Sequence, residues 1–258
     1  MKYKIEKNTV QETLIIPLYA RKVCSELYPN LYRDETAVRL IDEIDYDFSE
    51  AEKKSRSLMQ RFGSLEVAMR QNDLAFEVRD YLKSHPNAAV VNLGCGLDST
   101  GRSCDNGSCK IYNLDFPDVI TVRNELLPAG EREKNIPCNL NDTAWFSGID
   151  ASGGAVFFAS GVFYYFLTEQ VKTLVQKMAD AFPGGVLVLF AGSFQKHLTA
   201  VLGYDADAAK AITKKAKPKY KAIIADLLEF EKADRFKMNI VNCAMLGAFI
   251  HSRNWKPC

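Results

Sequence analysis

Residues 90–98 read Val90-Val91-Asn92-Leu93-Gly94-Cys95-Gly96-Leu97-Asp98, an apolar run that ends abruptly in a Gly-x-Gly turn. A second apolar run, residues 111–115, follows and ends in Asp115. Glycine lets the backbone approach a ligand closely because it has no Cβ atom. An acid about twenty residues past such glycines commonly holds a nucleotide ribose. The two runs therefore predict a buried strand, a tight turn, a helix start and a second strand, arranged to bind an adenosine-containing cofactor.

The residues after the turn indicate which cofactor. The nicotinamide fingerprint needs a third glycine, and Ser99 stands at that position. The Asp98 carboxylate would also repel a diphosphate. S-adenosylmethionine has an adenine, a ribose and an amino-acid end but no phosphate, so it fits this turn better. A nicotinamide oxidoreductase is the weaker functional alternative. The glycines could also serve only to pack a strand against a helix, with no ligand bound.

Composition bounds the class of protein. Of the 258 residues, 47% are hydrophobic and 25% charged, which is typical of a soluble globular chain. The formal net charge of +1 gives no overall positive potential that would attract nucleic acid or a membrane surface. No segment is apolar over the length of a membrane span. The charged N-terminus leads into no signal-peptide core. We therefore expect a cytoplasmic monomer or homodimer that acts on a small molecule and binds neither nucleic acid nor membrane.

The seven cysteines are an odd number without a secretory context, so we expect reduced thiols. The segment from Cys104 to Cys109 could form a metal or redox loop. Asn106-Gly107 within it is a turn signal, however, and no second pair of ligands follows. We therefore predict no metal site.

The chain divides into a helical front, residues 1–84, expected to be a cap or lid, and an α/β cofactor-binding body, residues 85–258. The front shows no strand pattern and ends in an amphipathic helix over residues 64–82. In the body, apolar strands alternate with helices, which predicts a Rossmann-like, mostly parallel seven-stranded sheet with helices on both faces. The expected strands are 88–93, 110–114, 136–139, 155–160, 186–190 and a closing pair within 236–252. The expected helices are 168–182 and an insertion at 195–233.

A parallel sheet of this kind binds ligands at the carboxyl ends of its strands. That rule places five small or polar residues along one rim of the sheet: Gly94, Gly96, Asp115, Asn139 and Ser160. Their convergence at the strand ends is stronger evidence for a binding site than any single motif.

Several further blocks accompany Val90–Asp98 in order. They are Ile16–Arg21, Asp34 to Phe48 (ending in Ile44–Phe48), Phe62 to Arg70, Leu114 to Arg123, Ala159–Phe166 and Phe182–Gly185. Together they resemble the leucine carboxyl methyltransferase family, especially its branch related to tetracenomycin polyketide O-methyltransferases. The resemblance covers roughly residues 13–192. It implies a class I S-adenosylmethionine-dependent methyltransferase, with S-adenosylhomocysteine as the product.

The resemblance also implies roles for single residues in cofactor binding. Arg70 matches the arginine that pairs with the methionine carboxylate, a contact suited to the bidentate guanidinium group. Asp115 would accept both ribose hydroxyls, and Asn139 with Leu140 would meet the adenine. Gly94 and Gly96 would line the methionine and ribose. Their motif neighbours are expected to contribute to the same site: Cys95, Asp98, Phe116 and Gly161. Ser160 stands where most members have a glutamate, which puts in doubt a carboxylate for the cofactor's amino group.

The chemistry is methyl transfer from an activated sulfonium, so the enzyme must align the reactants and exclude water. A carboxylate acceptor is ionised at neutral pH and needs no base, whereas a phenol needs one. His197 is the only histidine expected on the rim side, where it could contact the acceptor, but a lone histidine in a helical linker is more often inert. The lack of a clear base mildly favours a carboxylate acceptor.

Aromatic residues after the fourth strand are candidates for the acceptor pocket. Tyr165 matches the family tyrosine and is the candidate for substrate positioning; Phe163 and Tyr164 are candidate neighbours. Tyr19, with Arg21, could belong to a lid over the cofactor. All of these could equally be packing residues.

Three functions remain open on the sequence. The leading one is a small-molecule O-methyltransferase that acts on a carboxylate or hydroxyl. The second is methylation of a protein C-terminal carboxylate, as eukaryotic family members perform. The third is a cofactor-binding protein without transferase activity, which Ser160 in place of glutamate keeps open.

Overall fold

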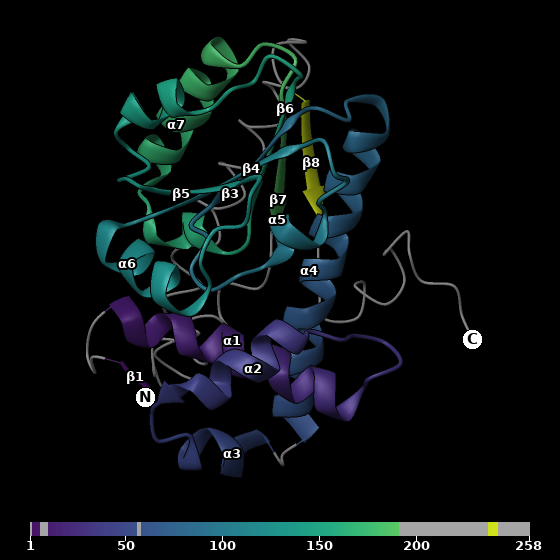
Figure 1. The fold of residues 1–258 in the computed structure, drawn as a ribbon, viewed down its shortest axis with the longest axis vertical. Helices are drawn as coiled ribbons and strands as arrows, with labels where there is room; N and C mark the ends of the chain where they lie inside the picture. The colour runs from purple at the N-terminus through teal and green to yellow at the C-terminus, as the bar shows by residue number, and fades with distance from the viewer. Residues whose placement is uncertain (1, 6–9, 56–57, 191–236, 242–258) are drawn as a thin grey trace.

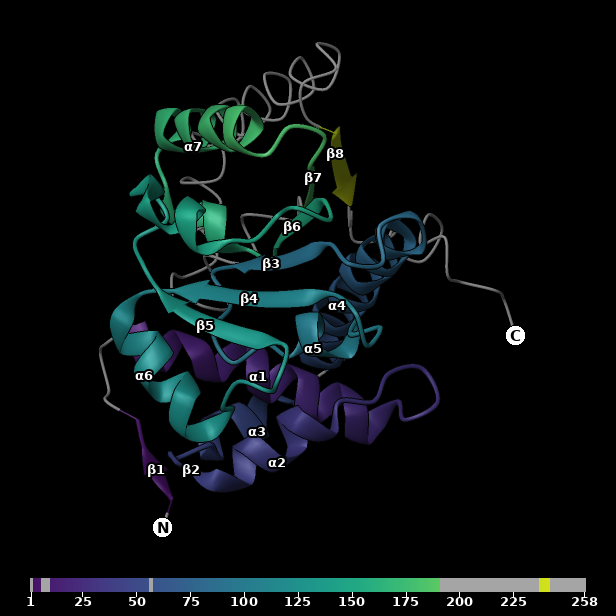
Figure 2. The same cartoon turned by 45° about the horizontal axis from the view of Figure 1, so that its top comes forward.

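The computed structural model describes residues 2–5, 10–55, 58–190 and 237–241. Its body is a parallel sheet with the order β5-β4-β3-β6-β7-β8 (Figures 1 and 2). The strands are β3 (Ala89–Leu93), β4 (Lys110–Asp115), β5 (Glu133–Pro137), β6 (Ala155–Ala159), β7 (Val186–Phe190) and β8 (Lys237–Val241). This is the order of the doubly wound nucleotide-binding fold, with the switch point between β3 and β6. The α/β, Rossmann-like class is confirmed.

The predicted seventh strand is not confirmed. The sheet has six strands in the described part of the chain, and of the expected closing pair only β8 falls there. Residues 245–251, like the helical insertion expected at 195–233, lie outside the described residues. Strand β5 begins three residues before the predicted position, because it is the edge strand. Its side chains are half-buried or exposed, so no continuous apolar run marks it.

The two faces of the sheet are covered by different helices (Figure 1). Because side chains alternate along a strand, Val91 faces α7 (Thr168–Ala181) and the 3-10 helix η1 (Thr143–Gly148), whereas Val90 faces α4 (Leu58–Ser84). The short helix α5 (Thr100–Ser103) lies on the α4 side. Each aliphatic side chain fully buried in these layers contributes about 1.5–3 kcal/mol.

A helical cap lies over the carboxyl ends of the strands, at the lower end of Figure 1. It contains α1 (Val10–Leu27), α2 (Glu35–Glu43) and α3 (Ser49–Ser55), and α1 and α2 pack on α6 (Pro117–Leu126) of the body. Asp34 caps α2, since its Oδ1 accepts the Ala37 N–H at 2.8 Å. The expectation of no strand before residue 84 was wrong. The two-residue strands β1 (Tyr3–Lys4) and β2 (Ile44–Asp45) pair in parallel, and they are too short to leave a pattern.

Helix α4 is shared between the cap and the body. Leu65 and Met69 in its first half pack with Cys24 of α1, whereas Leu74 and Val78 in its second half pack on the sheet. The helix, which ends at Ser84, therefore joins the cap to the body by packing on both.

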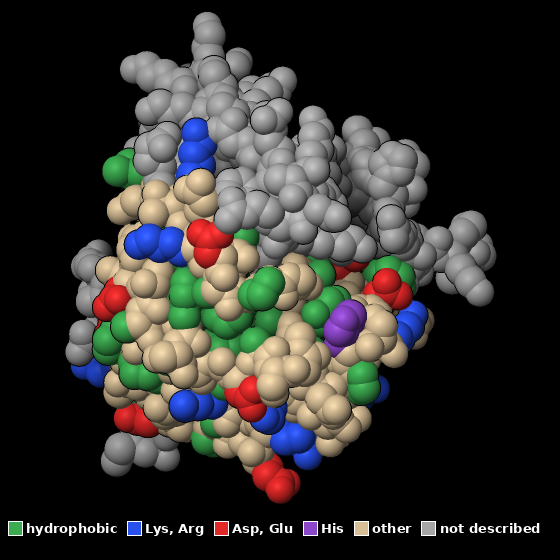
Figure 3. Space-filling view, turned by 90° about the horizontal axis from the view of Figure 1, so that it is seen from above, with side chains coloured by type: hydrophobic (Ala, Val, Ile, Leu, Met, Phe, Trp, Pro, Cys, Tyr) green, Lys and Arg blue, Asp and Glu red, His purple; other side chains and the backbone are tan. Residues whose placement is uncertain are grey.

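The molecular surface carries charges of both signs. On the face shown in Figure 3, basic and acidic side chains are scattered around a central group of apolar ones. Within the described ranges, no helix combines the length and apolar character needed to cross a membrane.

Candidate functional site

A cavity of about 500 Å³ lies between the cap and the carboxyl ends of the strands. It is bounded by the turns that follow β3, β4, β5 and β6, and by one side each of α1 and α4. Thirteen of the residues named from the sequence line it: Arg21, Arg70, Gly94, Cys95, Gly96, Asp98, Asp115, Phe116, Asn139, Leu140, Ser160, Gly161 and Tyr165. The structure thus brings the predicted cofactor residues together in one place.

Two of the predicted acceptor residues are placed elsewhere. The Tyr19 ring stacks on Phe48 inside the cap, with ring centroids 5.2 Å apart. Phe163 packs against the sheet core and meets Phe166 edge-on at 6.2 Å. The physical reason at Tyr19 is helical periodicity, since Pro17 and Arg21 face the cavity and a residue two positions from each points away. His197 and the side chain of Tyr164 lie outside the described residues.

The Gly94–Gly96 turn is shaped by its contacts within the protein. The N–H groups of Gly94 and Cys95 both donate to the Leu114 carbonyl at 2.9 Å. Gly94 has a φ of +67°, and a Cβ there would lie 2.4 Å from Cγ2 of Val162. Glycine is therefore required at position 94 by its backbone conformation and by the approach of η2 (Val162–Tyr165), whatever the ligand.

Asp115, at the tip of β4, holds the turn and faces the cavity. Its Oδ2 accepts the Gly96 N–H and its Oδ1 accepts the Phe116 N–H, each at 2.8 Å. Burial raises the pKa of this carboxyl above its ordinary value. Each carboxylate oxygen can accept a further hydrogen bond. The residue therefore retains acceptor capacity for a ligand with hydroxyl donors, such as a ribose.

Arg123 fixes the same turn from the opposite side. This arginine of α6 is fully buried, and its Nη1 donates to the carbonyls of Gly96 and Asp98, both at 2.8 Å. Its Nε donates to Asn135 at 3.2 Å. Because charge-assisted hydrogen bonds to carbonyls are strong, the turn is held in one conformation before any ligand arrives.

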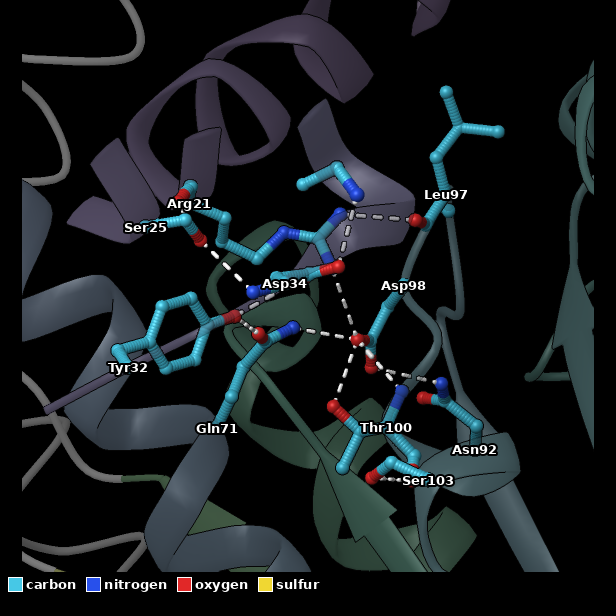
Figure 4. Close-up of polar contacts among 12 residues, drawn as sticks. Arg21, Ser25, Tyr32, Asp34, Gln71, Asn92, Leu97, Asp98, Thr100 and Ser103 are labelled. Atoms are coloured by element: carbon cyan, nitrogen blue, oxygen red, sulfur yellow. Dashed lines mark hydrogen bonds and ion pairs between the residues drawn. The ribbon is translucent and has the colours of Figure 1, made fainter. Parts of the chain in front are cut away.

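Asp98 lines the cavity, yet its carboxylate is engaged by the protein (Figure 4). Its Oδ1 accepts the backbone N–H and the hydroxyl of Thr100, at 3.0 and 2.7 Å, and also the amide of Gln71. Its Oδ2 accepts the Asn92 amide at 3.1 Å. The Arg21 guanidinium lies 3.4 Å from Oδ1. The Asp98 carboxylate, which lines the cavity, therefore also joins the sheet to the cap.

Arg21 is the cationic centre of this cluster. Its side chain is 3% exposed and lies 3.1 Å from Oδ2 of Asp34, the residue that caps α2. It also donates to the Leu97 carbonyl at 2.9 Å. Arg21 thus binds the first two cap helices to the Gly-x-Gly turn, a role that the sequence did not indicate.

Twelve lining residues were not predicted as part of the site. They are Thr13, Leu14, Pro17, Val67, Gln71, Leu97, Val119, Cys138, Asn141, Val162, Phe166 and Gln170. Spacing could have found some of them, since the α1 positions 13, 17 and 21 and the α4 positions 67, 70 and 71 each recur at helical intervals.

The ionisable groups of the cavity are few. Burial raises the pKa of the Cys138 thiol to about 12, and Asp115 and Asp142 add to the effect. None of the described lining residues is histidine or lysine. Within the described ranges, no cluster of three or more His, Cys, Asp or Glu side chains could hold a metal ion.

The fold and the cavity together define an α/β protein of the nucleotide-binding type, with an acid at the tip of the second strand beside a Gly-x-Gly turn. The model of the leucine carboxyl methyltransferase family matches residues 16–179, well over half of the sequence. The chain therefore belongs to this family of S-adenosylmethionine-dependent methyltransferases.

Individual proteins are also similar to this chain. The chain is 27% identical over 180 residues to the tetracenomycin polyketide synthesis O-methyltransferase TcmP of Streptomyces glaucescens, which covers 69% of this chain and 64% of TcmP. It is 26% identical over 193 residues to the S-adenosyl-L-methionine-dependent methyltransferase dpfgK of Gibberella zeae, with 70% and 64% covered. The chain thus spans slightly less than two thirds of these curated relatives. An O-methyltransferase family protein from Burkholderia thailandensis is 16% identical, with a TM-score of 0.40 over 70% of this chain and 60% of that one.

Proposed function

We propose that this chain transfers a methyl group from S-adenosylmethionine to a carboxylate or hydroxyl of a small molecule. The observation that carries the proposal is the cavity in which Arg70, Asp115 and the Gly94–Gly96 turn meet at the carboxyl ends of the strands. The name of the Streptomyces relative, a polyketide synthesis O-methyltransferase, supports a small-molecule acceptor.

The lining residues fit the parts of this cofactor. Arg70 would bind the amino-acid carboxylate, because a guanidinium group matches a carboxylate with two parallel hydrogen bonds. Asp115 would accept the ribose hydroxyls with the acceptor capacity that its two backbone contacts leave. Asn139, Leu140 and the half-exposed Phe116 would surround the adenine. Cys95, Ser160 and Gly161 would complete the wall.

When bound, S-adenosylmethionine supplies a methyl group that is already activated on a sulfonium sulfur. The chain's part is to align the acceptor and exclude water, and the cap of residues 1–84 would serve as the lid. Tyr165, 56% exposed, would position the acceptor. A carboxylate acceptor needs no base at neutral pH, and the described lining offers neither histidine nor lysine. This arrangement favours a carboxylate over a hydroxyl.

A second candidate rests on Ser160. It lines the cavity at the position where the family resemblance leads us to expect a glutamate, so no carboxylate there can hold the cofactor's amino group. A protein that binds the cofactor without transferring its methyl group is the function that this feature favours.

Calorimetric titration tests the proposal. We expect S-adenosylmethionine and S-adenosylhomocysteine to bind at micromolar concentrations and NADH not to bind. Asp115→Asn should weaken binding at least tenfold, because one acceptor becomes an N–H donor, while Asp118→Asn, an exposed acid three residues away, should not. Transfer of labelled methyl groups to a panel of small carboxylic acids and phenols then separates the candidates. Binding without transfer to any acceptor would favour the binding protein, and no binding of either ligand would refute both.

A further inference from the structure

Gln71 occupies a buried position between the cap and the glycine turn (Figure 4). Gln71 follows Arg70 in α4 and is 9% exposed. Both residues line the cavity. The amide Nε2 of Gln71 donates to Oδ1 of Asp98, and its Oε1 accepts the Tyr32 hydroxyl. Tyr32 itself lies 3.1 Å from the Asp34 carboxylate.

Asp98, the partner of Gln71 on the sheet side, is held by several further hydrogen bonds. Asn92 in β3 donates to Asp98 at 3.1 Å, and Thr100 in α5 donates to it through both its N–H and its hydroxyl. A displacement of Asp98 would break these bonds in a partly buried site, where unpaired polar groups are costly. The hydrogen bond from Gln71 therefore ties α4 to a fixed point on the glycine turn.

The chemistry at position 71 requires an amide. The Asp98 carboxylate only accepts, so position 71 must supply a donor on that side. The Tyr32 hydroxyl shares its single proton between Oε1 of Gln71 and Oδ2 of Asp34. An amide supplies one acceptor and one donor at the two ends of a planar group. A carboxylate at this position could still accept a hydrogen bond from Tyr32, but it could not donate to the Asp98 carboxylate and would repel it.

We propose that Gln71 is a positioning residue: through Asp98 it fixes α4 against the Gly94–Gly96 turn and so places Arg70 for the amino-acid carboxylate of the cofactor. The inference rests on the proposed function. Arg70 and Gln71 are consecutive residues of one rigid helix, so a restraint on the second limits the backbone of the first. Small misplacements of a binding group are known to cost large factors in affinity and rate.

The test compares two ligands that differ only at the amino-acid end. S-adenosylhomocysteine carries the carboxylate that Arg70 would bind, whereas 5′-methylthioadenosine keeps the adenosine and the sulfur and lacks that end. We expect Gln71→Leu to weaken S-adenosylhomocysteine binding roughly tenfold, as loss of a charge-assisted hydrogen bond between Arg70 and the ligand carboxylate implies, and to change 5′-methylthioadenosine binding less than about twofold. The isosteric Gln71→Glu should act in the same direction because it cannot donate to Asp98.

Two controls make the result specific. Gln176→Leu removes an exposed glutamine from α7 and should leave both affinities unchanged. In the Arg70→Met background, Gln71→Leu should have no further effect on S-adenosylhomocysteine, since the group that it positions is gone. Thermal unfolding of each variant verifies that it is folded, and Gln71→Glu keeps the test decisive if Gln71→Leu does not fold.

The possible outcomes distinguish a failure of this inference from a failure of the proposed function. Suppose that the wild-type protein binds S-adenosylhomocysteine more tightly than 5′-methylthioadenosine, but the Gln71 variants lower the affinity for both ligands equally or for neither. Gln71 then does not position Arg70, and the proposed function stands. If the wild-type protein binds neither ligand, the proposed function is wrong, and this inference with it.

Discussion

Replacing Arg21 by methionine should destabilise the protein strongly. The Arg21 guanidinium is the cation between two carboxylates, those of Asp34 and Asp98, at 3.1 and 3.4 Å. All three side chains are largely buried, with exposures of 3%, 8% and 15%. Methionine has a similar volume, so the change removes the charge and the hydrogen bonds while limiting any cavity.

The expected loss is about 3 kcal/mol. Removing one partner of a buried ion pair costs about 3–5 kcal/mol, because the other charge is left uncompensated. The lower end applies here, since Asp98 keeps its bonds from Asn92 and Thr100, and Asp34 keeps the Ala37 N–H. For a chain of this size, the melting temperature should fall by about 6–12 °C.

Urea unfolding followed by fluorescence and circular dichroism measures the change. Lys22→Met, the next residue on α1, is the matched control, because its ion pair with Glu26 is partly exposed and should contribute less than about 1 kcal/mol. The Arg21→Met/Asp34→Asn double variant should lose clearly less than the sum of the single changes. A loss below 1 kcal/mol for Arg21→Met, or strict additivity in the double variant, would refute the reasoning.

Three further outcomes are expected. Gly94→Ala should lose about 1–3 kcal/mol in urea unfolding, because its Cβ would lie 2.4 Å from Val162, and Val162→Ala in the same chain should recover part of the loss. Burial raises the pKa of Glu133, but the hydrogen bonds from Arg102 and Gly130 outweigh it, so the pKa lies below its ordinary value. Glu133→Gln should therefore lose about 1 kcal/mol at pH 7, and the difference should shrink as the pH falls below about 4.3, the unfolded pKa, and on through the folded one. Cys138, with a pKa of about 12, should be alkylated by iodoacetamide at pH 8 at least roughly a hundredfold more slowly than a free thiol, as peptide mass mapping would show. Rapid labelling of Cys138, or a Glu133→Gln loss independent of pH, would contradict these expectations.

Much of the body could be predicted from local sequence. The runs at 90–93 and 111–115 are strands because each is apolar, short and followed by a turn signal, and both strands were found within a residue of their predicted ends. The predicted position of β5 was three residues too late, because an edge strand needs no apolar run to mark where it begins. The rim residues followed from the same rule, since parallel strands that end together bring their following residues to one edge.

Residue roles within the site depended on packing that local sequence does not encode. Gly94 and Asp98 line the cavity, as the predicted site requires, but each also has a structural role: glycine at 94 is required by the approach of Val162, and the Asp98 carboxylate accepts hydrogen bonds from Gln71, Asn92 and Thr100. Tyr19 was expected over the cofactor because it stands in the N-terminal block, whereas the rotation of α1 turns its ring onto Phe48 within the cap and away from the cavity.

The sequence by itself determined the α/β class, the rim residues that line the cavity and the family, because these depend on periodicity, turn residues and motifs that lie within a few residues of one another. Only the tertiary structure decided how the cap is attached. Arg21 and Asp98 are 77 residues apart, and Gln71 and Asp98 are 27 apart. Whether such side chains meet depends on how α1 and α4 rotate and pack over the sheet, which is settled by the burial of whole helix faces and by the need to pair every buried charge.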